Sequence, residues 1–177
     1  MYLLAGPPGV GKTTLALQLT AAATQEAPVV VVTFEHGLAH LTLNLLCARA
    51  GINPRDVQRG YADLAKLRSA AEAWQPVAER LAVLEGSSQL TVAQVRAQAR
   101  RAMRQHQAER CLVVVDYLQL WAKVAEDLRG NFSVQERVDM LGGLLRELAL
   151  GLHGPVLALA SQNCSVGNDG NGKGSAA

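Results

Sequence analysis

Short apolar runs alternate with amphipathic segments along the whole chain. Runs rich in valine, leucine and alanine predict β-strands at 2–5, 29–34, 81–86, 111–120 and 155–160. Apolar residues at helical spacing predict helices at 12–24, 38–50, 53–80 with a break at Pro76, 91–107 and 133–151. This alternation predicts an α/β fold with a mostly parallel central sheet, helices on both faces, and ligand sites at the carboxyl ends of the strands.

Composition places the chain among globular domains without identifying a partner. The 177 residues are 49% hydrophobic and 18% charged, with a formal net charge of +2. We expect one core domain over 1–164 and a glycine-rich flexible tail over 165–177. The three cysteines are far apart and form no CxxC pair, which argues against a disulfide framework or a zinc site; they are Cys47, Cys111 and Cys164. No apolar run is long enough to span a bilayer, so we expect a cytoplasmic protein without membrane contact.

The sequence GPPGVGKT lies between the first predicted strand and the first predicted helix, and it matches the phosphate-binding pattern GxxxxGK[ST]. The residues expected to bind nucleotide are Gly6, Pro7, Pro8, Gly9, Val10, Gly11, Lys12, Thr13 and Thr14. Glycines allow backbone N–H groups to surround phosphates, and the helix N-terminus adds partial positive charge. We expect ATP as the ligand, with Lys12 on the β- and γ-phosphates and the Thr13 hydroxyl on Mg²⁺. The alternative is a chance glycine turn before a helix.

The segment GPPGVGKT is called the P-loop below. Three further polar residues end predicted strands and should meet this loop at one sheet edge. Asp116 follows four apolar residues and suits a Walker B aspartate in the Mg²⁺ shell, or it simply caps the next turn. Glu35 could accept a proton from the attacking water, or it could be a solvated loop residue. Gln162 could hydrogen-bond the γ-phosphate, or it could be an ordinary polar residue leaving a strand.

Four arginines share one face of the predicted helix 91–107, opposite its apolar face; they are Arg96, Arg100, Arg101 and Arg104. They could bind nucleic-acid phosphates, although a solvated helix face is the commoner explanation. His36 and His40 are four residues apart, but no third ligand accompanies them, so a metal site is not expected.

Four segments of the chain together resemble the C-terminal ATPase domain of the DnaB-type replicative helicases, which is RecA-like. The segments are AGPPGVGKTTLALQL, VVTFEHGLAHLTLNLLCARAGI, SSQLTVAQVRAQARRAMRQHQ with VVVDYLQL, and LALASQN. The resemblance assigns the catalytic glutamate to Glu35, the Walker B aspartate to Asp116 and the nucleotide-sensing glutamine to Gln162. It implies a homo-oligomer, usually a hexameric ring, that hydrolyses ATP between subunits and translocates on single-stranded DNA in replication. The channel loops would be 123–131 and the stretch after Gln162.

The chain departs from the family pattern at both ends. It opens on the first strand, where the family has a collar domain and a linker helix, and it stops where the family continues to an arginine that enters a neighbour's active site. Cys164 follows SQN, where the family commonly has arginine. A truncated chain, a partial gene and a diverged remnant are all compatible with this pattern, and we expect the isolated chain to bind nucleotide better than it hydrolyses it. A RadA-like or KaiC-like ATPase, or a nucleotide-binding module that is inactive without a partner, are the alternative functions.

Overall fold

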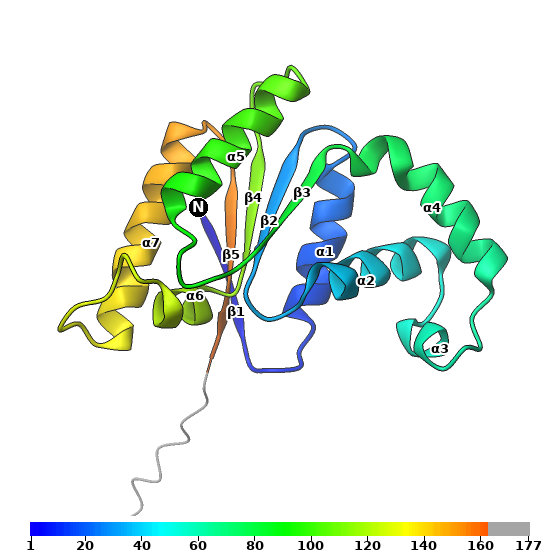
Figure 1. Ribbon diagram of the computed structural model, residues 1–177, viewed down its shortest axis with the longest axis horizontal. Helices are drawn as coiled ribbons and strands as arrows, with labels where there is room; N and C mark the ends of the chain where they lie inside the picture. The colour runs from blue at the N-terminus through cyan, green and yellow to red at the C-terminus, as the bar shows by residue number, and fades with distance from the viewer. Residues whose placement is uncertain (163–177) are drawn as a thin grey trace, which may run out of the picture.

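The computed structural model describes residues 1–162, which form a five-stranded sheet with helices on both faces (Figure 1). The strand order is β1-β5-β4-β2-β3 and every neighbouring pair is parallel. The strands are β1 (Tyr2–Gly6), β2 (Val29–Thr33), β3 (Leu81–Glu85), β4 (Leu112–Asp116) and β5 (Val156–Ser161). The predicted α/β class and parallel sheet are therefore confirmed. The predicted tail 165–177 lies outside the described residues.

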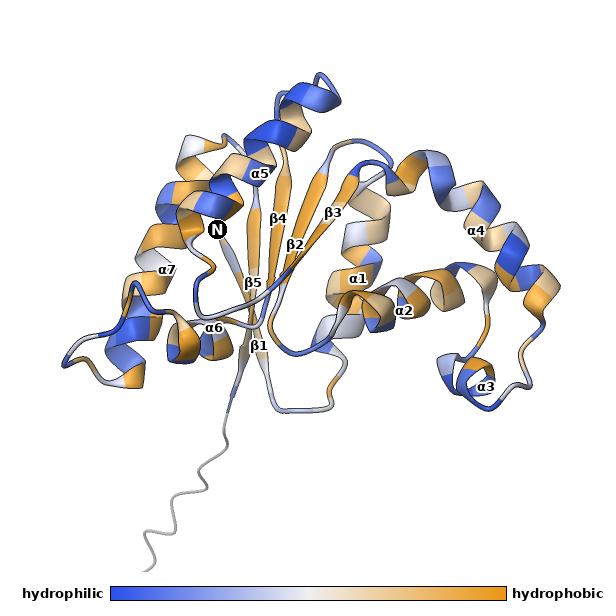
Figure 2. Cartoon of the chain, viewed as in Figure 1, coloured by the Kyte–Doolittle hydropathy of each residue, from blue (hydrophilic) through white to orange (hydrophobic). Residues whose placement is uncertain are grey.

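Seven helices cover the sheet within the described residues. They are α1 (Lys12–Ala23), α2 (Leu38–Ala50), α3 (Pro54–Gln58), α4 (Leu64–Ala78), α5 (Val92–Gln105), α6 (Leu118–Val124) and α7 (Val134–Gly151). Buried side chains of α5, α6 and α7 pack in one apolar cluster, and those of α1, α2 and α4 pack in another on the opposite face. The strands β2, β3, β4 and β5 between them are mostly hydrophobic, whereas β1 is paler (Figure 2). All five residues of β2 are buried, as expected for a valine run at the centre of a parallel sheet.

The predicted strand 111–120 is wrong in its second half. β4 ends at Asp116, and α6 begins at Leu118. Within this helix and just after it, Leu118, Trp121, Ala122 and Ala125 are buried at helical spacing. A continuous apolar run does not distinguish a strand from a buried helix, so the sequence pattern does not reveal where β4 ends and α6 begins. The predicted loop 123–131 consequently starts with the last residues of α6, and Ala125 and Leu128 anchor it in the core.

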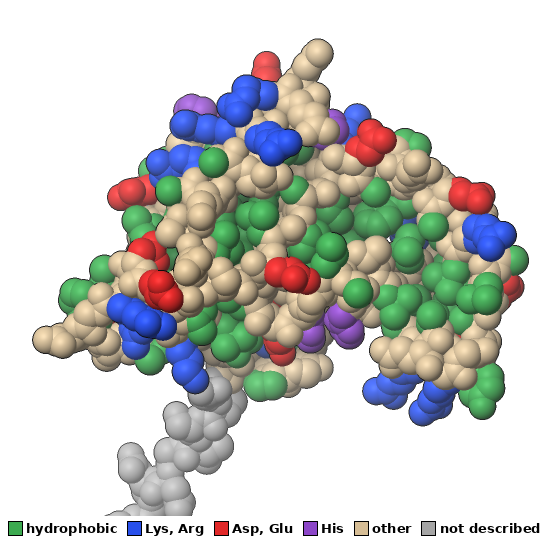
Figure 3. Space-filling model, viewed as in Figure 1, with side chains coloured by type: hydrophobic (Ala, Val, Ile, Leu, Met, Phe, Trp, Pro, Cys, Tyr) green, Lys and Arg blue, Asp and Glu red, His purple; other side chains and the backbone are tan. Residues whose placement is uncertain are grey.

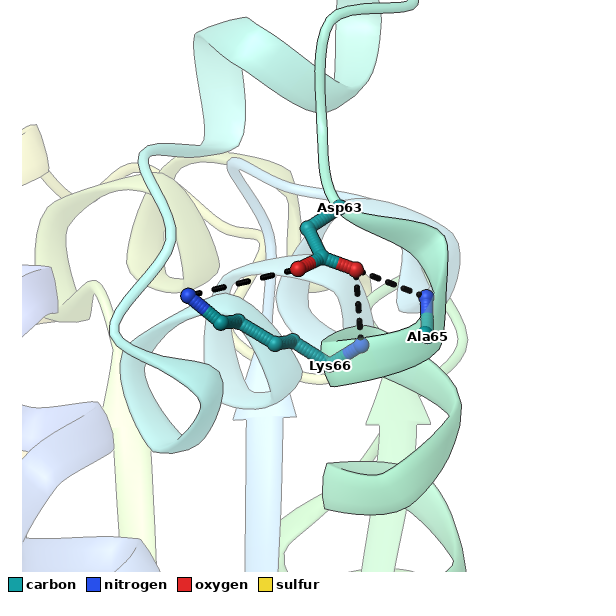
Figure 4. Close-up of polar contacts among 3 residues, drawn as sticks. All are labelled: Asp63, Ala65 and Lys66. Atoms are coloured by element: carbon teal, nitrogen blue, oxygen red, sulfur yellow. Dashed lines mark hydrogen bonds and ion pairs between the residues drawn. The ribbon is translucent and has the colours of Figure 1, made fainter.

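The predicted break at Pro76 is also wrong, because α4 runs through Pro76 to Ala78. The break lies earlier, where Gly60 adopts a left-handed φ of 76° just after α3. Asp63 then caps α4: its Oδ1 accepts hydrogen bonds from the N–H groups of Ala65 (3.0 Å) and Lys66 (3.1 Å), as Figure 4 shows. A glycine stop followed by an aspartate N-cap separates two helices that apolar spacing alone would join.

Two helices begin with capping boxes, formed by Thr91 with Gln94 and by Ser133 with Glu136. They fix the start of α5 and α7. Cys47 and Cys111 are buried free thiols. Burial raises the pKa of the Cys111 thiol to about 11. No helix among residues 1–162 is long and apolar enough to cross a bilayer.

Candidate nucleotide site at the carboxyl ends of the strands

The loop between β1 and α1 has the backbone shape that phosphate binding requires. Gly9 and Gly11 have φ angles of 80° and 91°, in the left-handed region that favours glycine. Gly11 is also the N-cap of α1, and no side chain caps this helix. The first N–H groups of α1 therefore remain directed into the loop, where an anion can accept hydrogen bonds from them.

Lys12 lies at the first position of α1 and folds its side chain over the loop. Its ammonium Nζ donates hydrogen bonds to the carbonyl oxygens of Gly6 and Pro7, each at 2.9 Å. The cation is thereby held at the mouth of the same loop that presents the helix N-terminus. Both features favour a polyanionic ligand.

Thr13 and Asp116 come together although 103 residues separate them in the sequence. The Thr13 hydroxyl donates a hydrogen bond of 2.9 Å to Asp116 Oδ2. Asp116 is only 4% exposed. Burial raises the pKa of the Asp116 carboxyl, the Thr13 hydrogen bond opposes that rise, and the nearby charge of Glu35 adds to it. The sheet thus joins the P-loop threonine to the carboxylate at the end of β4.

Glu35 lies in the same cavity as Lys12, Thr13 and Asp116. The cavity has a volume of about 420 Å³, and it is also lined by His36, Tyr117 and Ser161. The loop that carries Glu35 is fastened to the end of β2, because the hydroxyl of Thr33 donates to the carbonyl of His36 at 2.8 Å and accepts from its N–H at 3.1 Å. Glu35 itself is exposed.

The backbone of Gln162 lies next to the start of the P-loop, because its N–H donates a hydrogen bond of 3.0 Å to the carbonyl of Gly6. Its side chain is exposed and does not line the 420 Å³ cavity, to which Ser161 belongs instead. Gln119 of α6 fixes Ser161 with two hydrogen bonds, one to its carbonyl at 2.9 Å and one from its N–H at 3.2 Å. Sequence reasoning missed Gln119, Tyr117 and Ser161. Tyr117 and Gln119 could have been indicated only by their closeness in sequence to Asp116. No sequence signal pointed to Ser161.

A second cavity of about 560 Å³ adjoins the first, between α1 and α2. Thr13, Thr14 and His36 line both cavities, so the two are continuous around the start of α1. The rings of His36 and His40 stack with centroids 4.6 Å apart along this boundary. With these stacked rings and apolar side chains of α1 in its lining, the second cavity is more apolar than the first.

The donor atoms in the first cavity suit magnesium better than a softer metal. The Thr13 hydroxyl and the Asp116 carboxylate are hard oxygen donors, and Mg²⁺ is commonly bound by one or two such groups together with phosphates and water. Among residues 1–162, no group of three or more His, Cys, Asp or Glu side chains could hold a metal by itself. His36 and His40 therefore stack without a third metal ligand in the described part of the chain.

Comparison with known proteins identifies the family. The family model described as the DnaB-like helicase C terminal domain matches residues 1–173. The chain belongs to the DnaB-like helicase family. Replicative DNA helicase DnaB from Nostoc sp. is 33% identical over 178 residues, which cover 94% of this chain and 18% of the relative. Replicative DNA helicase DnaB from Leifsonia xyli subsp. xyli is 29% identical over 167 residues, which cover 92% of this chain and 35% of the relative.

The fold agrees with this DnaB-like assignment. A solved structure of a DnaB-like replicative helicase, described together with its interactions with primase, superposes with a TM-score of 0.80 at 23% identity. The match covers 94% of this chain and 39% of that one. The predicted resemblance and RecA-like fold are therefore confirmed. The chain spans about a fifth to a third of the length of the curated relatives that it matches.

Proposed function

We propose that this chain is the ATP-hydrolysing motor domain of a DnaB-type helicase, which couples hydrolysis to translocation on single-stranded DNA during replication. The observation that carries the proposal is the 2.9 Å hydrogen bond between Thr13 and Asp116, inside a cavity that Lys12 and Glu35 share. A chance glycine turn would not require a buried carboxylate from another strand beside its threonine. DnaB-like family membership favours this function over a RadA-like or KaiC-like ATPase.

In this proposal the triphosphate lies along the P-loop. The N–H groups at the start of α1 and the Lys12 ammonium bind its β- and γ-phosphates, and Lys12 exchanges the carbonyls of Gly6 and Pro7 for phosphate oxygens. The 560 Å³ cavity next to Thr14 receives the sugar and base. The two adjoining cavities thus divide one nucleotide between them.

Glu35 acts as the general base. A water oxygen attacks the γ-phosphorus, the bond from that phosphorus to the β–γ bridging oxygen breaks, and the water proton passes to the Glu35 carboxylate. Glu35 suits this role because it is exposed in the phosphate cavity. Thr13 and Asp116 would hold Mg²⁺, Asp116 through water, and the ion supplies neutralisation of the phosphate charge. Gln162 remains a predicted sensor of the γ-phosphate, with support only from the position of its backbone next to Gly6.

Single-stranded DNA and further copies of the chain in a ring are the proposed partners. The relatives from Nostoc and Leifsonia are called replicative DNA helicases, and this supports DNA as the track. Segment 123–131 remains a proposed channel loop, although its first two residues belong to α6. Glu126 fastens it, because its N–H donates to the carbonyl of Ser88 at 2.8 Å and its carboxylate accepts from the Ser88 hydroxyl at 2.7 Å. The second channel stretch, after Gln162, lies outside the described residues. The cytoplasmic location also stays a prediction.

The deciding experiment measures ATP turnover with and without single-stranded DNA, together with the mass of the protein in solution with ATP and Mg²⁺. Turnover that DNA stimulates in a ring-sized assembly is the expected result for a motor. ATP binding by a monomer that DNA does not stimulate would support a nucleotide-binding module that needs a partner. Absence of ATP binding would refute the proposal altogether.

A further inference from the structure

The loop that carries Glu35 leads from β2 to α2, and its first residue is anchored to neighbouring elements. The loop comprises residues 34–37 and is called the Glu35 loop below. The Phe34 N–H donates a hydrogen bond of 2.7 Å to the carbonyl of Asp116 at the end of β4. The Phe34 ring stacks on Trp121 of α6, with the ring centroids 5.4 Å apart. The start of the Glu35 loop is therefore fixed to β4 and to α6.

The Glu35 carboxylate depends on this backbone for its position. The hydrogen bonds of the Thr33 hydroxyl go to the backbone of His36, and no hydrogen bond to the Glu35 carboxylate is present among residues 1–162. A side chain without a partner of its own goes where its backbone carries it. The groups that hold the two ends of the loop therefore decide where the Glu35 carboxylate lies.

Glu85, the last residue of β3, holds the opposite end of the Glu35 loop. Its Oε1 accepts a hydrogen bond of 2.6 Å from the N–H of Leu38, the first residue of α2. The N-cap of α2 is Gly37, which has no side chain that could accept such a bond, and the first turn of the helix contains no acidic residue. Glu85 therefore supplies, from the strand next to β2, the negative group that a helix N-terminus favours.

The sheet places Glu85 at this point. β2 and β3 pair in parallel with Thr33 opposite Glu85, and the Gly86 N–H donates a hydrogen bond of 2.6 Å to the Thr33 carbonyl. Figure 3 shows acidic side chains in red and histidine side chains in purple close together in the lower middle of this view, near the start of α2. The strand end that carries Glu85 is thus tied to the residue from which the Glu35 loop departs.

Glu85 lies outside the nucleotide site itself. It lines neither the cavity of about 420 Å³ nor the cavity of about 560 Å³, and its side chain is exposed. A nucleotide in those two cavities would not touch it. Any effect of Glu85 on hydrolysis must therefore pass through the loop that Glu85 fastens.

We propose that Glu85 is a positioning residue for ATP hydrolysis: its hydrogen bond with the Leu38 N–H holds the Glu35 loop so that the Glu35 carboxylate meets the attacking water. The inference rests on the proposed function, in which Glu35 is the general base. Without Glu85 the Leu38 N–H loses its partner, and the loop is fastened only from the side of β2. A displacement of about 1 Å can lower the rate of a catalysed step by about a hundredfold. Loss of Glu85 should therefore slow hydrolysis while nucleotide binding stays intact.

The test compares substitutions at Glu85 in the full chain, assembled with ATP, Mg²⁺ and single-stranded DNA. Glu85→Ala removes the acceptor, whereas Glu85→Gln keeps an oxygen that can accept from Leu38 but removes the charge. Glu72→Ala is the matched control, because Glu72 is exposed on α4. Each variant is also made together with Glu35→Gln. Thermal melting verifies folding, and the measurements are kcat, KM, the Kd for ATP, and hydrogen exchange of peptides that cover residues 34–41.

Glu85→Ala should lower kcat at least about tenfold and change KM and Kd by less than about twofold, because the lost contact affects the base and not the phosphate site. Glu85→Gln should keep most of the turnover, since the hydrogen bond remains. In the Glu35→Gln background, Glu85→Ala should lower kcat no further, because no base is left to position. Exchange over residues 34–41 should become faster in Glu85→Ala and should not change in Glu72→Ala.

Three results would overturn the role of Glu85. Unchanged kcat in Glu85→Ala would mean that the bond to Leu38 does not position the base. An equal loss in Glu85→Gln and Glu85→Ala would mean that the charge matters and the hydrogen bond does not. A further loss of kcat in the Glu35→Gln background would mean that Glu85 acts independently of Glu35. Failure of the unsubstituted chain to bind or hydrolyse ATP would refute the proposed function instead; hydrogen exchange would then still decide whether Glu85 fastens the loop, and unchanged exchange in Glu85→Ala would refute that as well.

Discussion

Replacing Asp116 by asparagine should stabilise the fold while damaging the site. Asp116 is 4% exposed, and burial is the largest cause of its raised pKa. The ionised carboxylate therefore costs free energy in the folded chain, and the Thr13 hydrogen bond offsets only part of that cost. Asparagine retains an oxygen that can accept from Thr13 but carries no charge. We expect a gain of about 1 kcal/mol at pH 7.5, equal to a rise in Tm of about 2–4 °C for a chain of this size.

The direction of the pH dependence follows from the raised pKa. The folded chain holds the Asp116 proton more tightly than the unfolded chain does, so this carboxyl favours folding below its ordinary pKa of 3.8. That contribution is lost as the pH rises from 3.8 through the raised pKa of the folded state. The stability advantage of Asp116→Asn should therefore be full at neutral pH and should shrink as the pH falls toward 3.8.

The assay is thermal melting of both proteins from pH 4 to pH 8, with and without ATP and Mg²⁺. Saturation at about 100 times Kd would stabilise the unsubstituted chain by about 2.7 kcal/mol, and most of this Mg²⁺-dependent shift should disappear in Asp116→Asn. Asp127→Asn is the matched control, because Asp127 is exposed and its replacement should change stability by less than about 0.5 kcal/mol. A lower Tm for Asp116→Asn than for this control at pH 7.5 would refute the reasoning, since it would mean that the carboxylate charge is fully compensated.

Three further substitutions test the rest of the site and the core. Lys12→Ala should weaken ATP binding at least about a hundredfold, or about 2.8 kcal/mol, in a calorimetric titration, whereas the exposed Lys66→Ala should leave it unchanged. Glu35→Gln should keep ATP affinity and lower turnover in the active assembly by about 10² to 10⁴; unchanged turnover would exclude Glu35 as the base. Leu145→Ala should cost about 2–5 kcal/mol in denaturant unfolding, because Leu145 is 0% exposed, and a cost below 1 kcal/mol would contradict the described packing.

Strand ends were the most predictable parts of the site because they follow from a simple rule. Valine runs identify buried strands, and parallel strands bring their carboxyl ends to one edge. The structure accordingly places Glu35 and Asp116 in one cavity with the P-loop. The chemical roles of these residues remain predictions, since position alone does not reveal a proton transfer.

Residues that position others were harder to predict than residues that end strands. Gln119 secures Ser161 from α6, and its partner lies 42 positions away along the chain. Glu85 similarly accepts a hydrogen bond of 2.6 Å from the N–H of Leu38 at the start of α2. Gly86 permits the Phe34 ring to approach, because a Cβ at Gly86 would collide with that ring. Such pairings depend on the three-dimensional neighbourhood, and no local spacing encodes them.

Net charge was the least informative sequence quantity, because a sum over the whole chain hides local concentrations of charge. A formal charge of +2 gives no reason to expect a polyanionic partner. Yet the α5 arginines stand on a chain whose other residues sum to −2. In the proposed function, the attraction of ATP to the cavity therefore depends on local groups, namely Lys12 and the start of α1, which act against the acidic charges of Glu35 and Asp116.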